Sequence, residues 1–171
     1  MICVRGHSPL FYYRYDMINK TDILNIIQPI VEQKKAFIVD VFVSTANKII
    51  VELDSFDKIT IDDCVDVSRV INEHFDRETE DYELEVSSAG LSSAFKVIQQ
   101  YQKNIGKEVE TVTKDGKKLT GILNQVSEKA FSIDVKKSVK VEGKKKKQVV
   151  LESIEIPFEK VKSTKIVFNF N

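Results

Sequence analysis

The sequence is poor in the residues that build metal centres and hydrolytic sites. It contains two cysteines, Cys3 and Cys64, and two histidines, His7 and His74. Two isolated cysteines form neither a disulfide framework nor the paired spacing of a zinc site. They fit a reducing compartment, so we predict a cytoplasmic protein without a metal or another cofactor.

Long apolar segments and nucleotide-binding motifs are also missing. No apolar run approaches the length needed to span a bilayer, and the first residues do not form a secretory signal. The chain has no glycine-rich phosphate loop, no dinucleotide fingerprint and no zinc-protease helix. We therefore predict no membrane attachment, no small-molecule substrate and no enzymatic activity.

Charge is balanced over the whole chain but divided unevenly along it. Residues 1–90 hold 9 basic and 17 acidic residues, and residues 91–171 hold 17 basic and 9 acidic residues. Such a division suggests that the second half faces an anionic partner. The alternative, to which we give equal weight, is that the two halves attract each other or that the charges only solvate the surface.

The first half predicts a small α/β domain over residues 17–91. A helix capped by Thr21 or Asp22 is followed by two alternating strands that should form an antiparallel hairpin. Thr60 begins a second helix, with Asp63 completing a capping box. A strand from Tyr82 closes an αββαβ unit. Residues 1–16 form an N-terminal extension: either Met17 is the natural start, which we favour, or the extension is an arm that docks its aromatic side chains.

The second half predicts a small barrel. Residues 92–105 form a helical connector, and residues 106–171 alternate as short strands. A tight turn surrounds Gly116, and Gly121 marks a bend or bulge. Five such strands indicate an SH3-like or Sm-like β-barrel, which makes the fold class α+β.

Residues 84–91 read LEVSSAGL and mark the junction between the two domains. Leu84 and Val86 alternate with acidic and hydroxyl residues as in a half-buried strand. Ser87, Ser88 and the following Gly90, which admits positive φ, should then end the strand in a turn. A nucleophilic role for the serines has little support, because neither histidine is close in sequence and no nucleophile elbow is present. The predicted junction residues are Glu85, Ser87, Ser88 and Gly90, and Glu85 either holds the connector or meets a basic residue of a partner.

A lysine-rich segment lies in the middle of the predicted barrel. It is either a solvated edge that resists aggregation or a finger that binds phosphates, and we favour the finger. No aromatic residues are interleaved, so base stacking is not expected. The predicted RNA-binding or ribosome-binding residues are Lys136, Lys137, Lys140, Lys144, Lys145, Lys146 and Lys147.

Three stretches together resemble the bacterial ribosome maturation factor RimP family. The first stretch is TIDDC, beginning at Thr60, with VSR after it. The second is LEVSSAGL, which is similar to the family's LEVSSPG signature. The third combines GIL from Gly121 with IPFE from Ile156. The chain departs from the family pattern where Ala89 replaces the usual proline and Ser93-Ala94 replaces an Arg-Pro pair. These changes loosen the bend and remove a bidentate donor, for which Lys96 is no equivalent.

The resemblance implies a non-catalytic assembly factor with an α/β domain and an SH3-like barrel. Such a factor binds the immature small ribosomal subunit, contacting ribosomal RNA and a small-subunit ribosomal protein, and promotes its maturation. An alternative from another class is a general RNA-binding adaptor that uses only the Sm-like barrel. A hydrolase using Ser87 or Ser88 has the least support.

Overall fold

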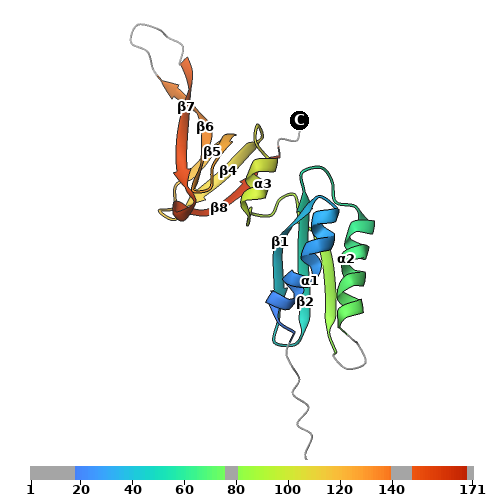
Figure 1. The fold of residues 1–171 in the computed structure, drawn as a ribbon. Helices are drawn as coiled ribbons and strands as arrows, with labels where there is room; N and C mark the ends of the chain where they lie inside the picture. Colours follow the sequence, from blue (N-terminus) through green and yellow to red (C-terminus); the bar gives the residue numbers. More distant parts are fainter. Residues whose placement is uncertain (1–17, 76–80, 140–147, 169–171) are drawn as a thin grey trace, which may run out of the picture.

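The computed structural model describes residues 18–75, 81–139 and 148–168. In these ranges it shows two units joined by a short connector (Figure 1). Each unit has its own sheet and its own apolar core. The α+β class is therefore confirmed, and the predicted extension over residues 1–16 lies outside the described residues.

The first unit begins with α1 (Lys20–Gln33), followed by β1 (Ala36–Val43), β2 (Lys48–Ser55), α2 (Ile61–His74) and β3 (Glu83–Ser88). β1 and β2 form the expected antiparallel hairpin, and β3 pairs parallel to β2 after the crossover through α2. The cap of α1 was predicted at Thr21 or Asp22, but Asn19 holds that place, because its side chain accepts the Thr21 backbone N–H at 3.0 Å.

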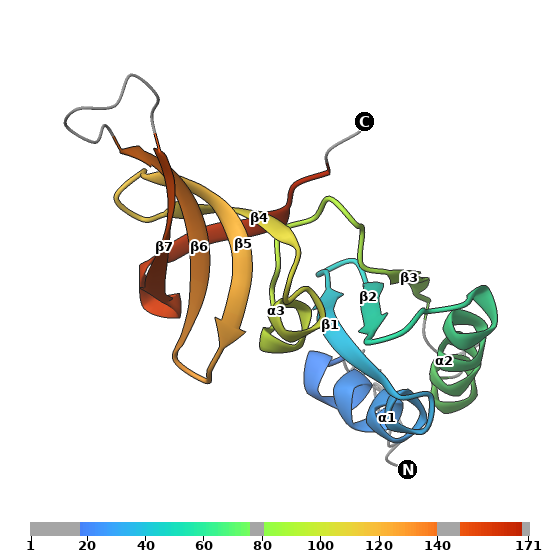
Figure 2. The same cartoon turned by 90° about the horizontal axis from the view of Figure 1, so that it is seen from above.

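Both helices of the first unit cover the same face of its sheet (Figure 2). Their apolar stripes are buried against alternate residues of the strands, as helical and strand periods require. No described helix is both long and apolar enough to cross a membrane. The fully buried side chains of this core are Ile23, Ile27, Val31, Val41, Ile49, Val51, Leu53, Val67 and Ile71.

A bulge at Val39 changes which side chains of β1 point to the core, compared with strict alternation. Strict alternation places Phe37 on the same face as Val41, but the register with β2 shifts between Ile38 and Asp40. The extra residue moves Ile38 to the core face, and Phe37 instead packs on Phe56 at 5.6 Å between ring centroids. The sequence pattern missed this shift because a bulge interrupts the two-residue period.

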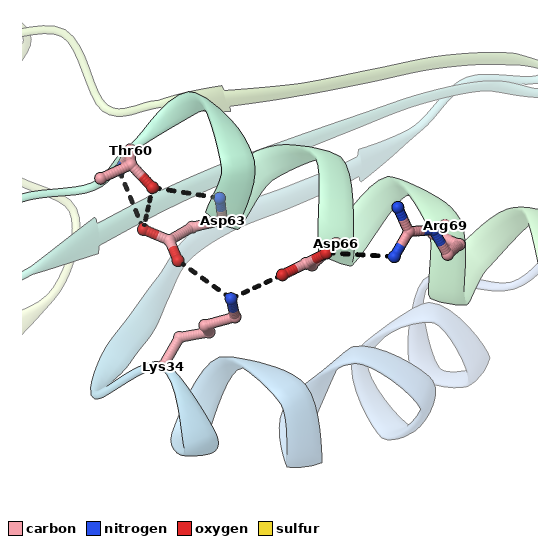
Figure 3. A network of polar contacts seen from close by, with 5 residues as sticks. All are labelled: Lys34, Thr60, Asp63, Asp66 and Arg69. Atoms are coloured by element: carbon pink, nitrogen blue, oxygen red, sulfur yellow. Dashed lines mark hydrogen bonds and ion pairs between the residues drawn. The ribbon is translucent and has the colours of Figure 1, made fainter.

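A polar network joins the end of α1 to the start of α2 (Figure 3). The predicted capping box is confirmed: the Thr60 hydroxyl accepts the Asp63 N–H at 3.2 Å, and the Asp63 carboxylate accepts the Thr60 N–H at 2.9 Å. Lys34 Nζ lies 3.3 Å from Asp63 and 2.5 Å from Asp66, and Arg69 pairs with Asp66 at 3.3 Å. The network therefore ties the C-terminal end of α1 to the N-terminal half of α2.

The capping box makes the stability of the folded protein depend on pH. Hydrogen bonds from the Thr60 hydroxyl and N–H, assisted by Lys34, lower the pKa of Asp63. A lowered folded-state pKa gives stability that is complete above the unfolded pKa of about 3.9 and is lost as the pH falls through the folded value. We expect Asp63→Asn to lower the melting temperature at neutral pH, with a difference from the unaltered protein that shrinks from about pH 5 to about pH 2. The control is Asp62→Asn in the same turn, and an equal, pH-independent loss in both variants would contradict the assignment.

The second unit contains α3 (Ile98–Lys103), β4 (Glu108–Thr113), β5 (Lys118–Val126), β6 (Ala130–Val139), β7 (Gln148–Pro157), the 3₁₀ turn η1 (Phe158–Lys160) and β8 (Val161–Ile166). The strands form an antiparallel sheet in the order β7-β6-β5-β4-β8. Between the described residues of β7 and β8 no ladder forms, so the expected closed barrel is not found. Closure depends on strand tilt and stagger, which alternation in a sequence does not reveal.

The second core is aromatic. Tyr101 of α3 packs against Phe131 and Phe158, with ring centroids 4.9 and 5.1 Å away, and Phe95 adds a further edge contact. The predicted turn at Gly116 is confirmed by its φ of +81°. The bulge expected near Gly121 occurs instead between Leu123 and Gln125.

β6 and β7 extend past the rest of their sheet. β5 pairs with β6 as far as the Ile122–Asp134 pair, whereas β6 and β7 continue to pair until Val139 and Gln148. The result is a two-stranded ribbon that projects from the second unit (Figure 1). This ribbon leads into residues 140–147.

Candidate functional site

The LEVSSAGL stretch forms β3 and the exit from the first unit. Leu84 and Val86 pack on the first core, as predicted, and Glu85 and Ser87 lie on the opposite face. The strand runs on through Ser88, and the Ala89 N–H still donates to Leu53 O at 2.8 Å. The chain turns only at Gly90, whose carbonyl accepts the Ser93 N–H at 3.0 Å.

Two expectations about this stretch are corrected. The serines belong to the strand and do not form its closing turn, because β2 offers a parallel partner as far as Leu53. Gly90 does not adopt positive φ, since the described glycines in that region are Gly106 and Gly116.

Ser87 and Ser88 line a small pocket of about 240 Å³ with the first turn of α2. His74 lies at the last residue of that 14-residue helix, roughly 20 Å away along its axis. Neither serine hydroxyl hydrogen-bonds to a described residue. His74 is therefore too far away to act as a base for either serine. Separately, in the described ranges no group of three His, Cys, Asp or Glu residues could hold a metal ion.

Glu85 does not hold the connector. Its carboxylate lies 3.8 Å from Lys48 Nζ, which forms a shorter pair of 2.8 Å with Glu83. These pairs raise the pKa of Lys48, with Glu83 contributing most. Of the two roles considered for Glu85, contact with a partner's basic residue is the one that the geometry leaves open.

The connector is held by two lysines that sequence reasoning did not select. Lys96 Nζ lies 2.9 Å from Asp40 and 2.8 Å from Glu52, and Lys103 Nζ lies 2.6 Å from Asp54. Pairing with Lys96 lowers the pKa of Asp40, and pairing with Glu52 and Asp40 raises the pKa of Lys96. The signal for this contact was the row of carboxylates on the polar face of the predicted hairpin.

The two lysines are fixed to the second unit. The Phe95 N–H donates to Thr164 O of β8 at 2.8 Å, and the Lys96 N–H donates to Gln100 Oε1 at 2.7 Å. Tyr101 anchors the same helix in the second core. Because the carboxylates belong to β1 and β2, these ion pairs join the two units, and the attraction between oppositely charged halves is real at this junction.

We expect the orientation of the two units to depend on these pairs. Lys96→Glu places three carboxylates together and should broaden the distribution of distances between spin labels on α2 and β5. In the unaltered protein, about 1 M salt should broaden this distribution in the same way, because it screens the ion pairs. Lys118→Glu is the control, because Lys118 pairs with Glu110 inside the second sheet at 2.7 Å. Unchanged distances in Lys96→Glu would show that the ion pairs do not set the orientation.

The structure places only part of the predicted lysine-rich site. Lys136 is exposed on β6 at the base of the ribbon, and Lys137 follows it in the same strand. Lys140, Lys144, Lys145, Lys146 and Lys147 lie outside the described residues. The described part of the ribbon, up to Val139 and from Gln148, projects from the second unit (Figure 1).

Comparisons with known proteins place the chain in a family. The model of the RimP N-terminal domain matches residues 26–92, which include most of the first unit. A protein named ribosome maturation factor RimP from Porphyromonas gingivalis is 38% identical over 146 residues, which is 85% of this chain and 96% of that protein. Proteins of the same name from Flavobacterium psychrophilum and Christiangramia forsetii are 30% and 34% identical, covering 84% and 78% of this chain and 92% and 90% of their own. On these similarities, and with LEVSS forming most of β3 in its first unit, the chain belongs to the ribosome maturation factor RimP family.

Proposed function

We propose that the protein is a non-catalytic factor of ribosome maturation that binds the immature small subunit in the cytoplasm. The observation that carries the proposal is similarity to proteins named ribosome maturation factor over 146 residues, a length that exceeds either unit alone. The similarity therefore extends over parts of both units.

The two units offer different chemistry to such a particle. The second unit carries the lysine-rich ribbon, and lysines attract a phosphate backbone without reading its sequence. We propose that this ribbon meets ribosomal RNA and that the rest of the second sheet, an SH3-like module left open between β7 and β8, meets a small-subunit ribosomal protein. The short antiparallel strands and the 3₁₀ turn before β8 support the SH3-like assignment.

A general RNA-binding adaptor is the second candidate. It is favoured by the ribbon itself, which would bind any accessible nucleic acid backbone. Comparing the affinity for small subunits, large subunits and unstructured RNA separates the two functions. Equal affinities would support the adaptor, and a preference for the small subunit would support the maturation factor.

Deletion of the gene tests the proposed function directly. We expect fewer mature small subunits, accumulation of small-subunit RNA precursors and recovery when the gene is restored. Normal subunit profiles and normal precursor levels would overturn the maturation role.

The ribbon makes a separate prediction. Replacing the lysines at residues 144–147 with serine should weaken small-subunit binding, and the slope of log affinity against log salt should fall by up to about three, because each phosphate contact contributes roughly 0.7 to 0.9. The control carries the same charge change at Lys114, Lys117, Lys118 and Lys129, which lie on other turns and strand ends of the second unit. An unchanged slope in the ribbon variant would remove the phosphate-binding role.

A further inference from the structure

The face of the first sheet that points away from α1 and α2 is ordered in rows across its strands. Phe42, Ile50 and Glu85 are aligned in one row, because Phe42 pairs with Ile50 and Ile50 pairs with Glu85. Asp40, Glu52 and Ser87 form the next row. Rows of this kind lie about 7 Å apart, and neighbouring strands about 4.8 Å.

One part of this face already binds cations. Asp40 and Glu52 hold Lys96, and Asp54 holds Lys103, with distances from 2.6 to 2.9 Å. The connector that brings these lysines lies on the side of the sheet opposite α1 and α2 (Figure 2). The carboxylates of this face therefore already bind basic side chains through ion pairs.

The adjoining row is uncovered. The Phe42 side chain is 55% exposed in a strand, and the Glu85 side chain is 54% exposed. Ile50 lies between them and is half-buried. An exposed phenylalanine next to an isoleucine and a carboxylate is an amphipathic surface, and it continues the surface that receives the connector.

We propose that the row of Phe42, Ile50 and Glu85 is a docking surface for an extended, arginine-bearing protein segment. The arginine lies across the row with its aliphatic stem on Ile50. Its guanidinium reaches Glu85 and replaces the long contact of that carboxylate with Lys48. Phe42 packs against the neighbouring residue of the segment or stacks on a second guanidinium.

The physical chemistry selects this occupant over others. The guanidinium is planar and weakly hydrated, so it binds a carboxylate at two points and packs well on an aromatic ring. Nucleic acid is repelled, because Glu83 and Glu85 leave this end of the face with more negative than positive charge beside Lys48. The surface adds a protein contact on the first unit to the one proposed for the second sheet, and the identification of its occupant as a ribosomal protein rests on the proposed function.

A peptide titration tests the surface without the ribosome. The probe is a ten-residue peptide with arginine at every second position and threonine between, and its matched control carries neutral citrulline in place of arginine. We expect amide shifts at residues 42, 50 and 85 with the arginine peptide, and an affinity lowered about fivefold or more by Glu85→Gln and by Phe42→Ser. Glu73→Gln, which removes the same charge from α2, should leave the affinity unchanged. Equal weakening by Glu73→Gln, or shifts spread over other acidic surfaces, would overturn the proposal.

A crosslinking experiment tests the class of partner. A photoreactive phenylalanine at position 42 is placed in the full chain with purified immature small subunits, and a second version carries it at position 73. We expect a crosslink to protein from position 42 and none from position 73, whereas a crosslink to RNA, or no crosslink from position 42 while the protein is bound to the particle, would contradict the docking surface. Failure of the proposed function would appear differently, as loss of particle binding with the peptide titration intact.

Discussion

Replacing Phe131 with alanine is expected to destabilise the second unit by about 3–5 kcal/mol, the usual cost of truncating a buried phenylalanine. Phe131 is 1% exposed, and its ring packs in the aromatic cluster, 4.9 Å from Tyr101 and 5.5 Å from Phe158. Its removal leaves a cavity that rigid aromatic neighbours fill poorly. Denaturant unfolding followed by methyl NMR signals of Ile133 and Leu123 measures the loss.

The same spectra contain two controls. Methyl signals of Ile49 and Val51 report the first core, which shares no residue with the second, and should keep their midpoint. Ile122→Ala removes an aliphatic side chain that is 40% exposed on β5 and should cost far less. If Phe131→Ala and Ile122→Ala cost the same, the aromatic cluster would not be the organising core.

Gly121→Ala is the second substitution with a large expected effect. A Cβ at this position would lie 2.5 Å from the Asp134 carbonyl oxygen and 2.9 Å from its carbon. Both atoms belong to the backbone of β6, so β5 and β6 must separate. We expect a loss of about 1–3 kcal/mol, the cost of forcing extra volume into a packed site, measured by denaturant unfolding.

Gly90→Ala is the matched control for this substitution. There the added Cβ would meet only the Ser93 hydroxyl, at 2.8 Å, and a side chain of this kind can rotate away. Since Gly90 has no positive φ, we expect a change within about 0.5 kcal/mol. A greater loss at Gly90 than at Gly121 would show that the junction, and not the strand crossing, is the sensitive site.

Local chemistry made much of the first unit predictable. The Thr60–Asp63 capping box, the β1–β2 hairpin and the alternation of Leu84 and Val86 each follow from neighbouring residues. The bulge at Val39 was not predictable, because it depends on how β1 fits its partner. The close approach at Gly121 was also hidden, since the atom it meets is 13 positions further along the chain.

The candidate site shows the same limit. LEVSSAGL indicated the family, but the side chains that join the units are Lys96, Lys103 and their carboxylates. Long-range ion pairs carry no periodic signal, and the division of charge between the halves and the carboxylates on the polar face of the hairpin were the signals that indicated them. For Glu85 the sequence left two roles open, and the contact that the structure gives its carboxylate is with Lys48.

The order of elements has a consequence for synthesis. The first core is complete at β3, before the connector and its two lysines. Domains generally fold as units from the N-terminal end while the chain is still being made. During synthesis, Asp40, Glu52 and Asp54 therefore stand without Lys96 and Lys103, and the nascent first unit presents a more acidic face, on which Lys20 pairs with Asp40, until the connector and α3 emerge.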